Sequence, residues 1–145
     1  MKTILFVCTG NTCRSPMAAA IMKLLLEKDG ITEIKAESAG IAAFDGEPAS
    51  QNAQKAAEEL GASLADHRAK QVERGLLAES DLVFAMTAAH AAALKAQFPE
   101  FKEKISVLGG GIPDPFGGSL DDYRRCRDSL VSELKIIADR FSLDK

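Results

Sequence analysis

The chain has 145 residues, the size of one ordinary domain with a single hydrophobic core. Hydrophobic residues make up 46% of it and charged residues 27%, as in folded globular proteins, and a net charge of −3 gives no reason to expect a nucleic-acid partner. No apolar run approaches the length of a membrane span, and three cysteines without a secretion signal do not indicate a disulfide framework. We therefore expect one cytoplasmic domain over residues 1–145, with no membrane association.

Apolar, β-prone runs alternate with helical patterns along the whole chain. Strands that alternate with helices imply right-handed crossovers, and hence an α/β fold with a parallel, doubly wound sheet. The segment 82–86 is continuously apolar, as in a strand covered on both faces. The predicted strands are residues 3–8, 34–38, 82–86 and 105–108, and the predicted helices are 15–28, 50–60, 71–79, 88–98 (capped by Thr87) and 120–141.

Residues 8–15, Cys-Thr-Gly-Asn-Thr-Cys-Arg-Ser, join the first predicted strand to the first predicted helix. Pro16 is expected at the first helical position and Ser15 at the N-cap. A loop that ends at a helix N-terminus directs several backbone N–H groups at one point and attracts a dianion such as phosphate. Gly10 and Asn11 are the residues best suited to the left-handed backbone that such a loop needs.

Cys8 and Arg14 enclose five residues and indicate what happens to the bound anion. Arg14 can hold two phosphate oxygens through parallel hydrogen bonds. Cys8, near that cation and the helix N-terminus, is expected to be a thiolate placed for in-line attack on phosphorus, and Ser15 can donate a hydrogen bond to its sulfur. The alternative is a buried cysteine at a strand end followed by a plain turn. The strand, the helix and the Gly-Asn and Ser-Pro pairs favour a catalytic loop.

Residues 7–18 resemble the phosphate loop of the low molecular weight protein tyrosine phosphatases. A second match is Asp114–Ser119, and shorter ones are Ser38–Gly40, His67–Arg68 and Asp81–Met86, so the resemblance extends over the chain. It implies a three-layer fold whose four parallel strands have the order 2-1-3-4, with the loop after strand one at the topological switch point. It also implies a phosphorylated protein as the partner and a mechanism without metal or cofactor, and a monomer is expected.

The candidate general acid lies in residues 109–118, which contain five glycines and two prolines. A loop so poor in regular structure at the end of a strand is more often functional than accidental. Asp114 stands between Pro113 and Pro115, which favour an extended backbone. The residues alone leave open whether Asp114 only begins a turn. The resemblance favours it as the acid that protonates the leaving group.

The resemblance assigns further roles around the loop. It implies that Asn11, Ser15, Ser38 and His67 form a hydrogen-bonded network that holds the loop in shape, and that Thr9, Gly10, Thr12 and Cys13 complete the phosphate-binding site. It also implies that Cys13 can form a disulfide with Cys8 under oxidation, which would protect the nucleophile; the alternative is an ordinary buried thiol. Cys126 shares one helical face with Leu130, Leu134 and Ile137, so core packing is its expected role.

Thr12 and Phe116 bear on which phosphoryl group is removed. The resembled family usually carries a bulky aliphatic residue and an aromatic hydroxyl at these positions. Thr12 together with Asp-Pro-Phe-Gly-Gly-Ser resembles the bacterial branch that removes phosphate from arginine. A threonine leaves room and a polar contact beside the planar guanidinium of phosphoarginine. We therefore favour protein phosphoarginine as the substrate, with phosphotyrosine as the alternative.

Two other classes share parts of this pattern. Arsenate reductases of this fold relay electrons through further cysteines in the middle of the chain, whereas residues 14–125 contain none. A module that only binds phosphoproteins, or that carries phosphocysteine without hydrolysis, does not need Cys8, Arg14 and Asp114 together. A phosphatase is therefore the favoured class.

Overall fold

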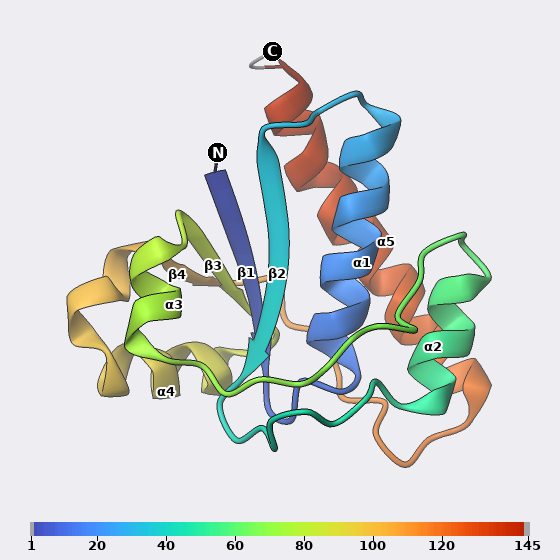
Figure 1. Ribbon diagram of the computed structural model, residues 1–145, viewed down its shortest axis with the longest axis horizontal. Coiled ribbons are helices and arrows are strands. Elements are labelled where there is room, and N and C mark those ends of the chain that lie inside the picture. The colour runs from blue at the N-terminus through green and yellow to red at the C-terminus, as the bar shows by residue number, and fades with distance from the viewer. Residues whose placement is uncertain (1, 144–145) are drawn as a thin grey trace.

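Four parallel strands form the centre of the computed structural model, which describes residues 2–143 (Figure 1). The sheet has the order β2-β1-β3-β4, as predicted, so that the first strand lies between the second and the third. Because the chain passes from β1 to β2 on one side and then crosses to β3 on the other, the carboxyl end of β1 lies at the topological switch point. The strands are β1 (Lys2–Cys8), β2 (Ile34–Gly40), β3 (Leu82–Ala85) and β4 (Ile105–Val107).

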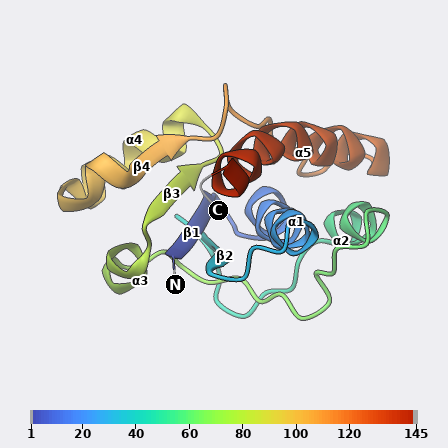
Figure 2. The same cartoon turned by 90° about the horizontal axis from the view of Figure 1, so that it is seen from above.

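Helices cover both faces of the sheet and complete three layers (Figure 2). The alternation of side chains along β1 explains this, because Ile4 and Phe6 are buried with α1, α2 and α5, whereas Leu5 and Val7 are buried with α3 and α4. The helices are α1 (Arg14–Lys28), α2 (Gln51–Glu58), α3 (Arg74–Glu79), α4 (Ala88–Gln97), the 3-10 helix η1 (Pro99–Lys104) and α5 (Leu120–Leu143).

The start of α1 differs from the prediction. The helix begins at Arg14, Cys13 occupies the N-cap without a side-chain cap, and Ser15 therefore lies inside the first turn. Pro16 is accommodated there because the first N–H groups of a helix have no intrahelical acceptor. The expectation that Ser15 caps the helix is wrong, and its hydroxyl is free for another partner. By contrast, Ser50 and Thr87 do cap α2 and α4, each accepting a hydrogen bond from a backbone N–H.

The buried face of α1 is wide. Ala18, Met22 and Leu26 are buried, whereas Ala20 and Leu24 are only half-buried. The helix packs on the sheet and on α5 at once, which widens its apolar stripe. None of the helices within residues 2–143 has both the length and the apolar character needed to cross a membrane.

Candidate active site

The loop between β1 and α1 presents backbone N–H groups that have no backbone acceptor among the described residues. None of the backbone N–H groups of residues 9–13 has a backbone acceptor within the described chain. Asn11 adopts the left-handed conformation, with φ of 59°, while Gly10 does not. The loop is also pressed against β2, since a Cβ on Gly40 would lie 2.5 Å from the Thr9 carbonyl oxygen and 3.0 Å from the Asn11 nitrogen. Donors without partners at a helix N-terminus form a site for an anion.

Asn11 joins this loop to α1 and to residues 67 and 70. Its side chain is buried, donates to Ser15 Oγ at 2.8 Å, and accepts from the backbone N–H of Lys70 at 3.0 Å. Its carbonyl accepts from His67 Nε2 at 2.7 Å. Burial lowers the pKa of His67 more than this hydrogen bond raises it, so the ring is neutral at neutral pH with the proton on Nε2.

The sulfur of Cys8 lies 2.9 Å from Ser15 Oγ in the buried interior of this loop. Because Ser15 Oγ accepts from Asn11 Nδ2, its own proton is free to be donated. The Ala39 carbonyl oxygen is a poorer acceptor for it, at 3.4 Å. A hydroxyl that donates to the sulfur stabilises the thiolate and the same sulfur as a leaving group.

Arg14 and Asp114 meet on the open side of the loop. The Arg14 side chain is 5% exposed and donates from one terminal nitrogen to the Ile112 carbonyl at 2.9 Å, while the other terminal nitrogen lies 3.6 Å from Asp114 Oδ2. The Asp114 side chain is 52% exposed, and its other oxygen accepts from the Phe116 N–H at 3.0 Å. Asp114 therefore both begins a turn and reaches the site. Phe116, 76% exposed, lies beside it on the same loop.

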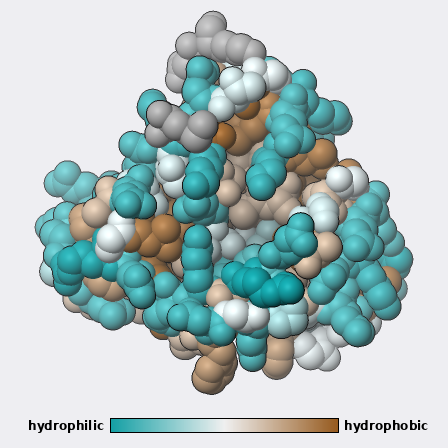
Figure 3. Space-filling view, in the orientation of Figure 1, coloured by the Kyte–Doolittle hydropathy of each residue, from teal (hydrophilic) through white to brown (hydrophobic). Residues whose placement is uncertain are grey.

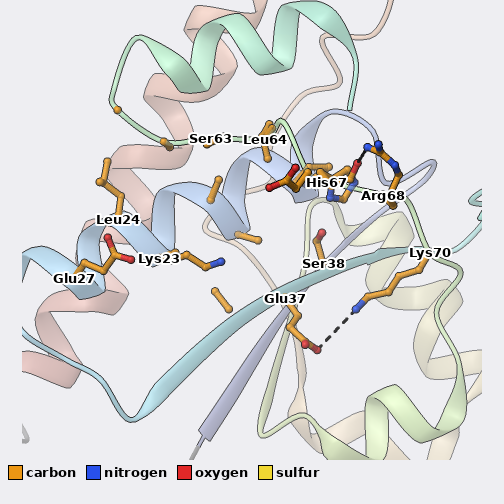
Figure 4. Close-up of a pocket in the computed structure, with 17 residues that line it drawn as sticks. Lys23, Leu24, Glu27, Glu37, Ser38, Ser63, Leu64, His67, Arg68 and Lys70 are labelled. Atoms are coloured by element: carbon orange, nitrogen blue, oxygen red, sulfur yellow. Dashed lines mark hydrogen bonds and ion pairs between the residues drawn. The ribbon is translucent and has the colours of Figure 1, made fainter. Parts of the chain in front are cut away.

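Ser38 is brought near the support network but makes no side-chain hydrogen bond within residues 2–143. It is 6% exposed and lines, with His67, a hollow of about 580 Å³ between α1, β2 and residues 61–70 (Figure 4). Figure 3 shows this part of the surface as neutral and apolar, bordered by hydrophilic side chains. On the rim, Lys70 Nζ lies 3.9 Å from Glu37 Oε2. Of the four residues expected in the network, the structure therefore links Asn11, Ser15 and His67.

Cys13 faces a different set of partners from Cys8. Its buried sulfur lies 3.3 Å from the hydroxyl of Tyr123 on α5 and 3.6 Å from Ser50 Oγ at the start of α2. All three cysteines are free thiols. Burial raises the pKa of Cys126 to about 12, and this thiol packs in the core as predicted.

Two residues near the loop were not anticipated from the sequence. Tyr123 is buried against Cys13, and burial followed by that hydrogen bond raises its pKa to about 12. His90 contacts Thr9 from the first turn of α4. The available signal was their position, since each lies within four residues of the start of a helix that follows the carboxyl edge of the sheet. Thr12, also in the loop, is half-buried and its hydroxyl lies 3.7 Å from the Cys13 sulfur.

A thiol beneath an anion cradle, a buried guanidinium and an open carboxyl together define a phosphoryl-transfer site of the cysteine-dependent kind. The family model for low molecular weight phosphotyrosine protein phosphatases matches residues 3–145, and the chain belongs to that family. It is therefore a phosphoprotein phosphatase that works through a covalent phosphocysteine.

The relatives of this chain include both arginine phosphatases and tyrosine phosphatases. A protein-arginine-phosphatase of Geobacillus stearothermophilus is 39% identical, over 98% of this chain and 97% of that protein. A low molecular weight protein-tyrosine-phosphatase of Streptomyces coelicolor is 34% identical, over 88% of this chain and 85% of that one. A solved structure of the YwlE arginine phosphatase, a mutant with a phosphorylated active-site serine, is similar with a TM-score of 0.94 and 36% identity, covering 99% and 97% of the two chains.

Proposed function

We propose that this phosphatase acts preferentially on phosphorylated arginine in proteins, with Cys8 as nucleophile, Arg14 as the phosphate-binding cation and Asp114 as acid and base. The observation that carries the residue roles is the arrangement around Cys8: Ser15 Oγ lies 2.9 Å from its sulfur, and an Arg14 nitrogen lies 3.6 Å from Asp114 Oδ2. We place the enzyme in the cytoplasm, where a reducing environment keeps such a thiol active.

In the first step, the Cys8 thiolate attacks phosphorus and an S–P bond forms as the P–N bond to the arginine breaks. Asp114 gives its proton to the leaving nitrogen, which departs as a neutral guanidine and then takes up a proton from water. Arg14 and the unpaired N–H groups of residues 9–13 stabilise the equatorial oxygens. The exposure of Asp114 suits this role, because the carboxyl must reach a group that enters from solvent.

In the second step, the ionised Asp114 takes a proton from water, and the water oxygen attacks the phosphocysteine. The S–P bond breaks, inorganic phosphate forms, and the Cys8 thiolate is recovered with the Ser15 hydroxyl donating to it. No metal or cofactor takes part in either step.

The preference for arginine is supported by Thr12 and by the relatives. Thr12 is half-buried in the loop, where a larger aliphatic side chain would crowd a planar guanidinium and remove a polar contact. Asp114 can accept hydrogen bonds from guanidinium nitrogens as well as donate its proton. The arginine phosphatase of Geobacillus stearothermophilus aligns over nearly the whole chain.

The test compares kcat/KM on one peptide carrying phosphoarginine and on its phosphotyrosine counterpart, for the wild type, Thr12→Ile and Thr12→Val. Valine matches threonine in size without the hydroxyl, so it separates polarity from volume. We expect a preference for phosphoarginine that Thr12→Ile reverses. A preference for phosphotyrosine that is indifferent to residue 12 would overturn the arginine assignment and leave a tyrosine phosphatase, the activity named for the Streptomyces coelicolor relative.

A further inference from the structure

His90 links the start of the phosphate loop to the start of α4. It is 6% exposed, and both of its ring nitrogens lie at hydrogen-bond distance from hydroxyl groups. Nε2 lies 2.8 Å from Thr9 Oγ1, and Nδ1 lies 3.0 Å from Thr87 Oγ1. Thr9 directly follows the nucleophile Cys8, and Thr87 is the N-cap of α4. A buried imidazole thus connects the catalytic loop to a second element of the fold.

The partners of Thr87 favour one direction for this chain of hydrogen bonds. Thr87 Oγ1 already accepts from the His90 backbone N–H at 3.2 Å. Among the described residues His90 Nδ1 is the acceptor within reach of its one proton, so a bond donated by Thr87 to Nδ1 satisfies both groups. A neutral ring then carries its proton on Nε2 and donates it to Thr9 Oγ1. The Thr9 hydroxyl proton is left free, on a residue that is exposed beside the cradle.

We propose that His90 is a positioning residue for the phosphate loop, and that it anchors Thr9 as the neutral Nε2–H tautomer through the directed chain Thr87 to His90 to Thr9. It adds a side-chain anchor from α4 to the support that Asn11 receives from residues 67 and 70. The proposal rests on the phosphatase chemistry of the loop and is independent of the preference for arginine.

The charges around His90 favour the neutral ring. Burial lowers its pKa, the nearby Arg14 guanidinium lowers it further, and the Asp114 carboxylate raises it less. Because the pKa of the folded ring is below the ordinary value, the neutral form predominates at neutral pH. Protonation in acid would put a hydrogen on Nδ1, break the bond donated by Thr87, and add a cation beside Arg14.

The tautomer can be read directly by nitrogen NMR, because the chain contains only two histidines. Spectra of the wild type and of His67→Gln identify the His90 ring. We expect, at neutral pH, a protonated Nε2 and a bare Nδ1, and a change in both shifts when sulfate fills the cradle. A ring protonated on Nδ1, or on both nitrogens, at neutral pH would overturn the directed chain.

Two substitutions then test the anchoring role. His90→Gln keeps an amide donor near the place of Nε2, and His90→Asn keeps one only near the place of Nδ1. With p-nitrophenyl phosphate as substrate, we expect kcat/KM and sulfate inhibition within about twofold of wild type for His90→Gln, and roughly threefold to tenfold weaker for His90→Asn, the loss expected for one hydrogen bond. Melting temperatures of the two variants should agree.

Equal kinetics for the two variants would refute the role of the Nε2 donor. The generic substrate keeps this test separate from the proposed specificity, since a phosphotyrosine preference would change neither result. If the wild type had no turnover at all, the phosphatase assignment would fail, whereas the sulfate affinities and the tautomer would still decide the role of His90.

Discussion

The two loops that form the site are built in opposite ways. The phosphate loop is held from several directions, by residues 67–70, by residues 41 and 42, by Ser50 and by His90. The acid loop, residues 109–118, contains no helix or strand, and the Asp114 side chain is 52% exposed. The difference follows the chemistry, because donors for a fixed dianion gain from being held in place, whereas the acid must meet a large leaving group and then water.

Substitution of Cys8, inside the phosphate loop, has the largest expected effect on turnover. Cys8→Ser should abolish turnover of p-nitrophenyl phosphate, since the hydroxyl is a far weaker nucleophile, while sulfate or vanadate still binds to the intact cradle. The matched control is Cys126→Ala, which removes a buried thiol that packs in the core without a hydrogen bond among the described residues and should keep most of the wild-type turnover. Turnover by the Cys8→Ser protein would contradict the mechanism.

Substitution of Asp114 in the acid loop should have the next largest effect on turnover. Asp114→Asn removes the proton donor and base and should slow hydrolysis by roughly 10²–10⁴-fold, the usual range for a lost acid–base group. Asp121→Asn, on an exposed carboxylate at the start of α5, is the control and should leave kcat/KM almost unchanged. A loss of less than about threefold for Asp114→Asn would move the acid to another group.

Gly40 tests how rigidly the phosphate loop is held. A methyl group there would lie 2.5 Å from the Thr9 carbonyl oxygen, so Gly40→Ala must displace the loop, at a cost of about 1–3 kcal/mol in the free energy of unfolding. We also expect weaker sulfate binding. The control is Gly75→Ala in α3, where a Cβ meets nothing within 4 Å and helix propensity should add up to about 1 kcal/mol. Equal melting temperatures for the two variants would show that the loop yields easily.

The sequence could predict features that depend on neighbouring residues, but not contacts between distant ones. The strands and the phosphate loop carry local signals, namely short apolar runs, a Gly-Asn pair and the spacing of Cys8 and Arg14, whereas the strand order was implied by the family resemblance. The contact between Thr9 and His90 spans 81 positions, and that between Cys13 and Tyr123 spans 110. Which residue of a first helical turn faces the loop depends on how α4 and α5 are rotated by packing, and a single sequence does not state that rotation.

Ser15 and Ser38 differ in how far their expected positions agree with the structure. Ser15 was expected at the N-cap, but the N-cap is Cys13, two residues earlier, whereas the expected contact of its hydroxyl with the Cys8 sulfur is present at 2.9 Å. Ser38 lies beside the network with no side-chain hydrogen bond in the described chain, so its supporting role stays a prediction.

The smallest expected effect lies in the scaffold beneath the phosphate loop. Glu59, at the end of α2, accepts hydrogen bonds from Arg124 and Arg127 of α5, and these lower its pKa to about 2. These two helices also carry the partners of Cys13, so the ion pairs fasten the elements that support one side of the loop. Glu59→Gln should lower the melting temperature at neutral pH by a small amount, because the ion pairs are exposed to solvent.

The pH dependence of this effect has a definite sign. A carboxylate whose folded pKa lies below its unfolded value stabilises the protein above the unfolded pKa, and that contribution disappears as the pH falls toward the folded pKa. The difference in melting temperature between wild type and Glu59→Gln should therefore be largest above about pH 5 and shrink toward about pH 2. Glu58→Gln, on an exposed neighbour without an ion pair in the described chain, should show no such trend. A difference that persists unchanged in acid would mean that Glu59 acts through packing, and the phosphate loop would then owe its support on this side to Tyr123 and Ser50 alone.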